Sequence, residues 1–184
     1  MTPKTGTDAF WQWSLSFYGR SGAKDRLLAL QDRYLVEVNT TLWCIWTAHR
    51  GWCLTDEQVR EIVGAASLFA ARGAEPIRSV RRFFSAKRPQ IDDDDRAAFR
   101  KTLLAVELEA ERLVQQALVH GTLSAAGPPS APVPKAIANA AAKHFMAALE
   151  GLEKPVMFAD ERKSRAPLTL FGELLALIEV ETQT

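Results

Sequence analysis

The chain has 184 residues, and its 23 basic and 22 acidic side chains give a formal net charge of +1 with histidine neutral. Hydrophobic residues make up 47% of the chain and charged residues 24%, an ordinary balance for a globular protein. This composition argues against a disordered chain, a fibrous repeat and a protein that binds nucleic acid through bulk positive charge. The length fits one domain, or one domain with an appendage.

Capping residues and glycines predict six helices in the first two thirds of the chain. Thr55 followed by Gln58 matches a capping box, in which each side chain hydrogen-bonds a backbone N–H of the other. The predicted helices run from Thr7 or Asp8 to about Tyr18, from Ser21 to about Tyr34, from Asn39 or Thr40 to Gly51, from Thr55 to Gly73, from Pro76 to about Ala86, and from Asp92 to just before Gly121.

The sixth predicted helix carries the clearest apolar pattern in the chain. Its first stripe consists of Phe99, Leu103, Val106, Ala110, Leu113 and Ala117, which are spaced alternately by four and three residues. Leu104 and Leu108 form a second stripe. Because such stripes usually bury against neighbouring helices, we predict that this helix is the central post of a bundle.

The composition changes after Gly121. Residues 122–134 read as a linker rich in proline and alanine, and residues 135–184 as a helical appendage with a polar loop over 155–167. The last helix, predicted over Leu168–Val180, has two apolar faces and must dock on the bundle or on a partner. The sequence therefore predicts an all-α fold: a multi-helix bundle (residues 8–121) around a long central helix, with a helical C-terminal appendage.

The chain shows no apolar segment behind a basic one at its start, and its apolar runs are far shorter than the roughly 20 residues of a membrane span. The two cysteines, Cys44 and Cys53, do not form a disulfide framework. We therefore expect a cytoplasmic protein without a membrane span.

All five tryptophans lie between Trp11 and Trp52. This concentration favours a large aromatic core. Two alternatives stay open: an exposed docking stripe that contains Trp11 and Tyr18, since such residues are common at interface hot spots, or a closed apolar pocket for a lipid-like ligand. The pocket would be lined by Trp13, Trp43 and Trp46.

Five segments share a further pattern. They are Phe10-Trp11-x-Trp13-Ser14-Leu15-x-Phe17-Tyr18, Leu30-Gln31-Asp32, Val38-Asn39-x-x-Leu42-Trp43-Cys44-x-Trp46, Ile77-x-x-Val80-Arg81-Arg82 and Glu107-Leu108-Glu109-Ala110-Glu111-Arg112. Together they resemble a family of small uncharacterised proteobacterial proteins, over roughly Asp8 to Gly121. The resemblance implies an all-helical domain of Gram-negative bacteria and supplies no activity.

Several polar residues predict a structural network. Asp32 and Asn39 sit where they could cap helices, and Glu107, Glu111 and Arg112 lie on the flank of the sixth helix. We expect the two glutamates to pair with arginines of the preceding helix. A di-iron site would need Glu-x-x-His motifs, which are missing here, and an enzyme built on Asp32 and the two glutamates would need them to converge in a cleft.

Other candidate sites are weaker. Cys44, His49 and Cys53 have neither the spacing nor the fourth ligand of a zinc site, and His120 and His144 stand alone in the sequence. No phosphate-binding loop or nucleophile motif occurs. We therefore predict no catalytic residue, metal or cofactor.

The fifth predicted helix is basic on one side. Its positive residues are Arg78, Arg81, Arg82, Lys87 and Arg88, and the acidic run 92–95 follows at once. Such a face can be solvated or salt-bridged, or can bind an acidic protein, a nucleic acid or a membrane.

These observations favour a non-catalytic protein–protein interaction or adaptor module, with another protein or a second copy of the chain as its partner. The predicted contact residues are Trp11 and Tyr18, the basic residues Arg78, Arg81 and Arg82, and Phe171 and Leu175 of the last helix. A binder of an apolar small molecule or lipid is the alternative, and a protein that contacts nucleic acid is a less favoured one.

Overall fold

The computed structural model describes the chain except at residues 128, 130–133, 152–165 and 180–184. Throughout the described part the regular elements are helices and no strand occurs, so the prediction of an all-α fold is confirmed. The helices are α1 (Pro3–Tyr18), α2 (Ala23–Tyr34), α3 (Val38–His49), α4 (Asp56–Phe69), the π-helical turn η1 (Ala70–Ala74), α5 (Glu75–Phe83), α6 (Asp93–Ala125), α7 (Pro134–Gly151) and α9 (Ala166–Glu179).

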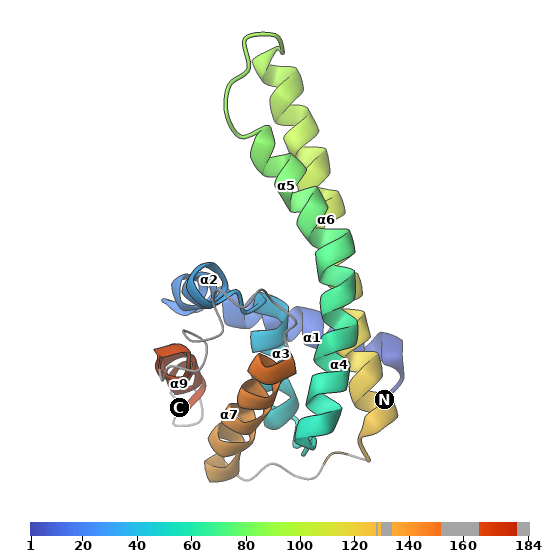
Figure 1. The fold of residues 1–184 in the computed structure, drawn as a ribbon, viewed down its shortest axis with the longest axis vertical. Helices are drawn as coiled ribbons and strands as arrows, with labels where there is room; N and C mark the ends of the chain where they lie inside the picture. The colour runs from blue at the N-terminus through green and yellow to red at the C-terminus, as the bar shows by residue number, and fades with distance from the viewer. Residues whose placement is uncertain (128, 130–133, 152–165, 180–184) are drawn as a thin grey trace.

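The molecule consists of a helical body and a long two-helix projection (Figure 1). In the body, α3 is surrounded by other helices, and its residues 39–48 are all buried. Helices α1, α2, α6 and α7 pack around it, while α4 packs between α6 and α7. None of the described helices is long and apolar enough to cross a membrane.

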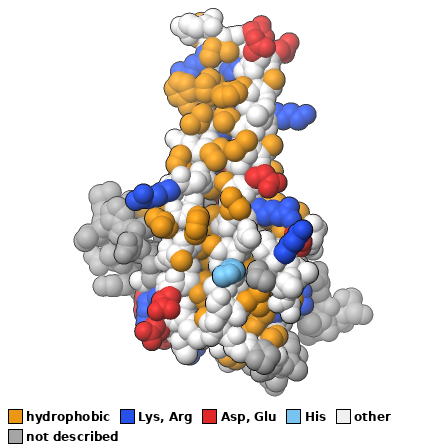
Figure 2. Space-filling model, turned by 90° about the vertical axis from the view of Figure 1, so that its right-hand side faces the viewer, with side chains coloured by type: hydrophobic (Ala, Val, Ile, Leu, Met, Phe, Trp, Pro, Cys, Tyr) orange, Lys and Arg blue, Asp and Glu red, His pale blue; other side chains and the backbone are white. Residues whose placement is uncertain are grey.

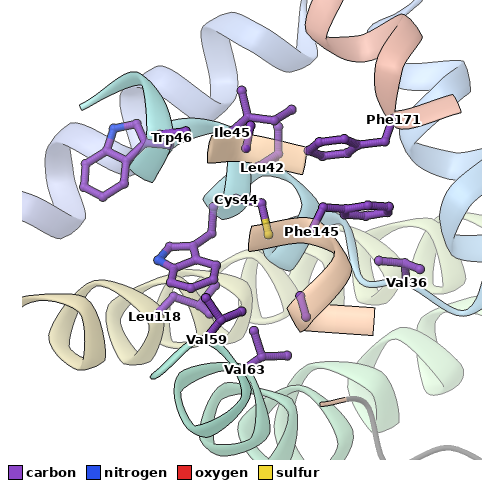
Figure 3. Packing of buried hydrophobic residues seen from close by; sticks show 14 of the residues in the cluster. Val36, Leu42, Cys44, Ile45, Trp46, Val59, Val63, Leu118, Phe145 and Phe171 are labelled. Atoms are coloured by element: carbon purple, nitrogen blue, oxygen red, sulfur yellow. The ribbon is translucent and has the colours of Figure 1, made fainter. Parts of the chain in front are cut away.

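The core of the body is aromatic, as the tryptophan-rich segment predicts. Trp43 and Trp46 are completely buried, and the ring of Trp46 lies 4.9 Å from Phe10 and 5.2 Å from Trp52 between centroids. The indole N–H of Trp43 donates to the Thr122 hydroxyl of α6 at 2.9 Å, so its polar atom is satisfied within the core. Figure 3 shows Leu42, Cys44, Ile45 and Trp46 of α3 projecting in different directions into the core.

The C-terminal helices complete this core. Phe145 of α7 stacks on Phe171 of α9 with ring centroids 4.0 Å apart (Figure 3), and Arg26 of α2 pairs with Glu173 of α9 at 2.8 Å. The last helix therefore docks on its own chain. Residues 122–125 of the predicted linker 122–134 belong to α6, whereas residues 128 and 130–133 lie outside the described part, as do most of the predicted polar loop 155–167 and Val180.

Three helix starts differ from the predicted ones. Helix α1 begins at Pro3 because the Thr2 side chain caps it, and α2 follows Gly22, whose φ of 78° suits a residue without a Cβ. Helix α3 begins at Val38, so Asn39 lies inside the helix and points into the body. The prediction of Asn39 as a cap is wrong. The capping box of Thr55 and the cap at Asp92 are confirmed.

The predicted break at Gly73 is wrong. Helices α4 and α5 are joined by η1 into one continuous rod, which Figure 1 shows running from the body into the projection. Pro76 cannot donate to the carbonyl four residues earlier and would clash with it in a regular α-helix. The π-turn just before the proline widens the helix and makes room for the proline ring. The backbone therefore changes its hydrogen-bond pattern there and the helix does not end.

The predicted end of the sixth helix is also wrong, because α6 continues through Gly121 to Ala125. Gly121 serves as a point of close approach. A Cβ there would lie 2.9 Å from Cγ1 of Ile62 and 3.1 Å from its Cγ2, so α4 and α6 touch at this glycine. Gln58 strengthens the same contact by donating to the Ala125 carbonyl at 2.7 Å.

The apolar stripe of α6 is not its buried face. Phe99, Val106 and Leu113 are exposed, and α6 enters the body through a different face. That buried face consists of Glu107, Val114, Gln115, Leu118, Val119 and Thr122. The prediction that the first stripe packs against the bundle is wrong, because the part of α6 that carries most of it lies in the projection (Figure 1).

We expect Gly121→Ala to lower the free energy of unfolding by about 1–3 kcal/mol, because the branched Ile62 side chain has no free end that can yield. Gly64→Ala is the matched control. Gly64 lies in α4 with nothing within 4 Å of its added Cβ, so alanine should stabilise it by up to about 1 kcal/mol. Urea unfolding of both variants checks the prediction, and a loss of stability that is equal in the two would contradict it.

Candidate functional site

The projection consists of the end of α4, η1, α5, the loop after it and α6 as far as Leu113; we call it the arm (residues 68–113). Ion pairs hold its two helices together. Nε of Arg78 donates to Oε1 of Glu107 at 3.0 Å, and Nη2 of Arg81 donates to the same oxygen at 3.2 Å. Arg81 also donates to the second oxygen of Glu107, and Arg78 donates to Glu111. The predicted pairing of the glutamates with arginines of the preceding helix has this geometry.

The network continues from the arm into the body. The Asn39 amide donates to the second oxygen of Glu111, and Gln115 donates to the Asn39 carbonyl oxygen at 2.9 Å. Gln115 also lies 3.2 Å from the Ser14 hydroxyl. Side chains of α5, α6, α3 and α1 are thereby joined in one continuous set of hydrogen bonds.

The two glutamates have pKa shifts of opposite direction. Burial raises the pKa of Glu107, but hydrogen bonds and positive charge from Arg81 and Arg78 outweigh it, so the net shift is downward. Burial also raises the pKa of Glu111; Arg78 opposes this, the nearby charge of Glu107 adds to it, and the net shift is upward. The hydrogen bond to Glu107 raises the pKa of Arg81.

This arrangement ties helices together and leaves little room for acid–base chemistry. All four carboxylate oxygens of Glu107 and Glu111 accept hydrogen bonds from side chains of the same chain. Asp32 is exposed on α2 and does not join them, so the three acids of the enzyme hypothesis do not converge. Among the described residues, no three His, Cys, Asp or Glu side chains are grouped as metal ligands would be.

The other predicted polar residues lie outside this network. Arg112 pairs with Asp8 and links α6 to α1, and Arg82 is exposed on the arm. Cys44 is buried, which raises the pKa of its thiol, whereas Cys53 is exposed. The two cysteines therefore lie in different environments, one buried and one exposed.

The outer surface of the arm is rich in apolar side chains. The described part of the chain has thirteen large exposed hydrophobic side chains, and ten of them belong to the arm. These ten are Leu68, Phe69, Val80, Phe83, Ile91, Phe99, Leu104, Val106, Leu108 and Leu113. Figure 2 shows hydrophobic side chains covering much of one side of the projection. The arm thus buries charge between its helices and exposes hydrocarbon, the reverse of an ordinary amphipathic hairpin.

A buried histidine forms a second polar site in the body. Nε2 of His144 accepts the Leu54 backbone N–H at 3.2 Å, so the neutral ring carries its hydrogen on Nδ1, 3.1 Å from the Thr47 hydroxyl. That hydroxyl donates to the Trp43 carbonyl at 2.9 Å. Burial is the main cause that lowers the pKa of His144, to about 4.

The family model described as "Protein of unknown function (DUF2390)" matches residues 9–118. The chain belongs to this family. No curated protein and no solved structure matches it. The matched span runs from α1 into the last third of α6 and includes the entire arm and every member of the network. Helices α7 and α9 lie beyond it, although they complete the core of the body.

The predicted contact residues have different environments. Trp11 and Tyr18 are half-buried, and Tyr18 packs against the core. Phe171 and Leu175 are buried, the former against Phe145, so they are removed from any contact surface.

The sequence reasoning missed two features. The first is the exposed apolar surface of the arm: the apolar stripe of α6 was identified, but it was predicted to be buried. The second is the role of His144. No signal near His144 in the sequence relates it to Thr47, which lies 97 residues away.

We expect Arg78→Met to lower the free energy of unfolding by about 2 kcal/mol, since it removes the donor shared by two buried or half-buried carboxylates. Arg82→Met, on the exposed side of the same helix, is the matched control and should change stability by less than about 0.5 kcal/mol. Thermal or urea unfolding measures both. Equal losses of stability in the two variants would contradict a specific contribution of the Arg78 ion pairs.

His144 makes stability depend on pH in a defined window. The unfolded chain binds a proton at an ordinary histidine pKa of 6.5, and the folded chain only near 4, so the unfolded state holds more protons between these values. Stability should therefore fall as the pH drops from 6.5 to 4, by on the order of 3 kcal/mol from this group. His144→Gln should flatten that fall, and the exposed His120→Gln should keep it. An unchanged slope in His144→Gln would contradict the assignment.

Proposed function

We propose that the protein is a non-catalytic interaction module of the bacterial cytoplasm, and that the arm is its association surface. The observation that supports this is the reversed polarity of the arm: the helices meet through arginine and glutamate, and the hydrocarbon side chains face outward. Large exposed apolar patches on globular proteins mark sites of association, because covering them releases ordered water.

The chemistry of the arm favours a protein partner over a nucleic acid. Two of the three arginines predicted to form a basic contact face, Arg78 and Arg81, donate to carboxylates within the chain. Lys87 pairs with Asp93 at 2.8 Å, and Arg96 pairs with the same carboxylate at 3.0 Å. These four basic side chains are therefore engaged within the chain and contribute less to binding phosphates, whereas the apolar side chains match the apolar surface of another protein.

Site-specific photocrosslinking in the cells of origin tests this proposal. A photoreactive phenylalanine analogue is placed on the full chain at Phe83 or Phe99 of the arm, and at Leu15 or Met146 of the body, which are similarly exposed. We expect protein adducts from the arm positions and only background from the body positions. Mass spectrometry then identifies each adduct.

Three outcomes would contradict the proposal. Arm positions could yield no adduct, arm and body positions could yield equal adducts, or the adducts could contain lipid and no protein. Each variant is first checked for native unfolding behaviour, so that a missing adduct reports on contact and not on misfolding.

A further inference from the structure

The exposed stripe of α6 has the spacing of a coiled-coil interface. The residues concerned, which we call the seam, are Phe99, Leu103, Val106, Ala110 and Leu113. Their alternating intervals of four and three residues are the repeat that allows two helices to pack side by side along their whole length. Phe99, Val106 and Leu113 are exposed by 45–59%, and Leu103 and Ala110 are half-buried. A surface of this kind fits another helix better than it fits a small molecule or an irregular loop.

Helix α5 extends the same apolar face. Phe84, which follows α5, makes an edge-on contact with Phe99 with centroids 5.0 Å apart, so the end of α5 and the seam belong to one surface. Phe83 contacts Phe84 in turn at 5.1 Å. Two helices with a shared apolar face form half of a four-helix bundle, and a second hairpin of the same kind would complete it.

We propose, as a deepening of the function proposed above, that the arm binds the arm of a second copy of this chain through the seam. Each copy presents the same apolar repeat, so the two seams can pack against each other as a self-complementary interface.

The area of the face is sufficient for a dimer. A fully exposed large apolar side chain offers on the order of 200 Å², so the four half-exposed ones on this face, Phe83, Phe99, Val106 and Leu113, supply about 400 Å² per copy. The more buried Leu103, Ala110 and Phe84 bring the area to about 500 Å². Two copies then bury about 1,000 Å² before the flanking charged side chains are counted, which is the lower bound for a specific interface. The contact is isologous, so each seam substitution acts twice.

Sedimentation of the purified full chain tests this inference. We expect a dimer at about 100 µM, and Val106→Asp should raise the dimer Kd at least about tenfold because it places two carboxylates in the seam. Leu104→Asp is the matched control: Leu104 is similarly exposed on the same helix, but it lies off the seam. This variant should leave the dimer intact. Leu113→Asp should behave like Val106→Asp, and the unfolding curves of the three variants show that each is folded.

The outcomes separate this inference from the function on which it rests. A monomer at that concentration, or equal effects of Val106→Asp and Leu104→Asp, overturns the pairing. If arm photocrosslinks then reach a different protein, the interaction module stands and only its partner changes; if they reach none, both proposals fail.

Discussion

The arrangement of the molecule depends on where two guanidinium groups lie. Arg78 and Arg81 project from α5 toward α6 and hold Glu107 and Glu111 between the helices. Because charge occupies the inside of the arm, the hydrocarbon side chains of both helices are left on its outside. Ion pairs of this kind specify how two helices register more than they stabilise them. The apolar outer surface, and the association proposed for it, follow from this single constraint.

The body fixes the base of the arm. Glu111 is joined through Asn39 and Gln115 to α3 and α1, and the close contact at Gly121 presses α6 against α4. Helix α3, buried along ten consecutive residues, supplies the framework for these contacts. The arm is therefore a continuation of two helices, α4 and α6, whose other ends are held in an aromatic core. Its surface is presented on a fixed support.

The sequence predicted what is local and left open what is long-range. The capping box at Thr55 and the cap at Asp92 could be predicted because their partners lie within three residues. The Arg–Glu pairing could be predicted from charge on successive helices. The apolar stripe of α6 was visible, but its spacing says only that a face is apolar and not what covers it. His144 could not be interpreted, since its partners come from a distant helix and loop.

The most direct measurement of the central claim is a carbon-NMR titration of the Glu107 carboxyl group in the full chain. The account predicts that its pKa lies below the usual range of glutamate, because Arg81 and Arg78 outweigh the effect of burial, and that the pKa rises when Arg81 is replaced by methionine. A pKa at or above the usual range, unchanged by that substitution, would contradict it. Glu107 would then not lie between the two arginines, and the ion pairs would not explain why the arm exposes its hydrocarbon side chains.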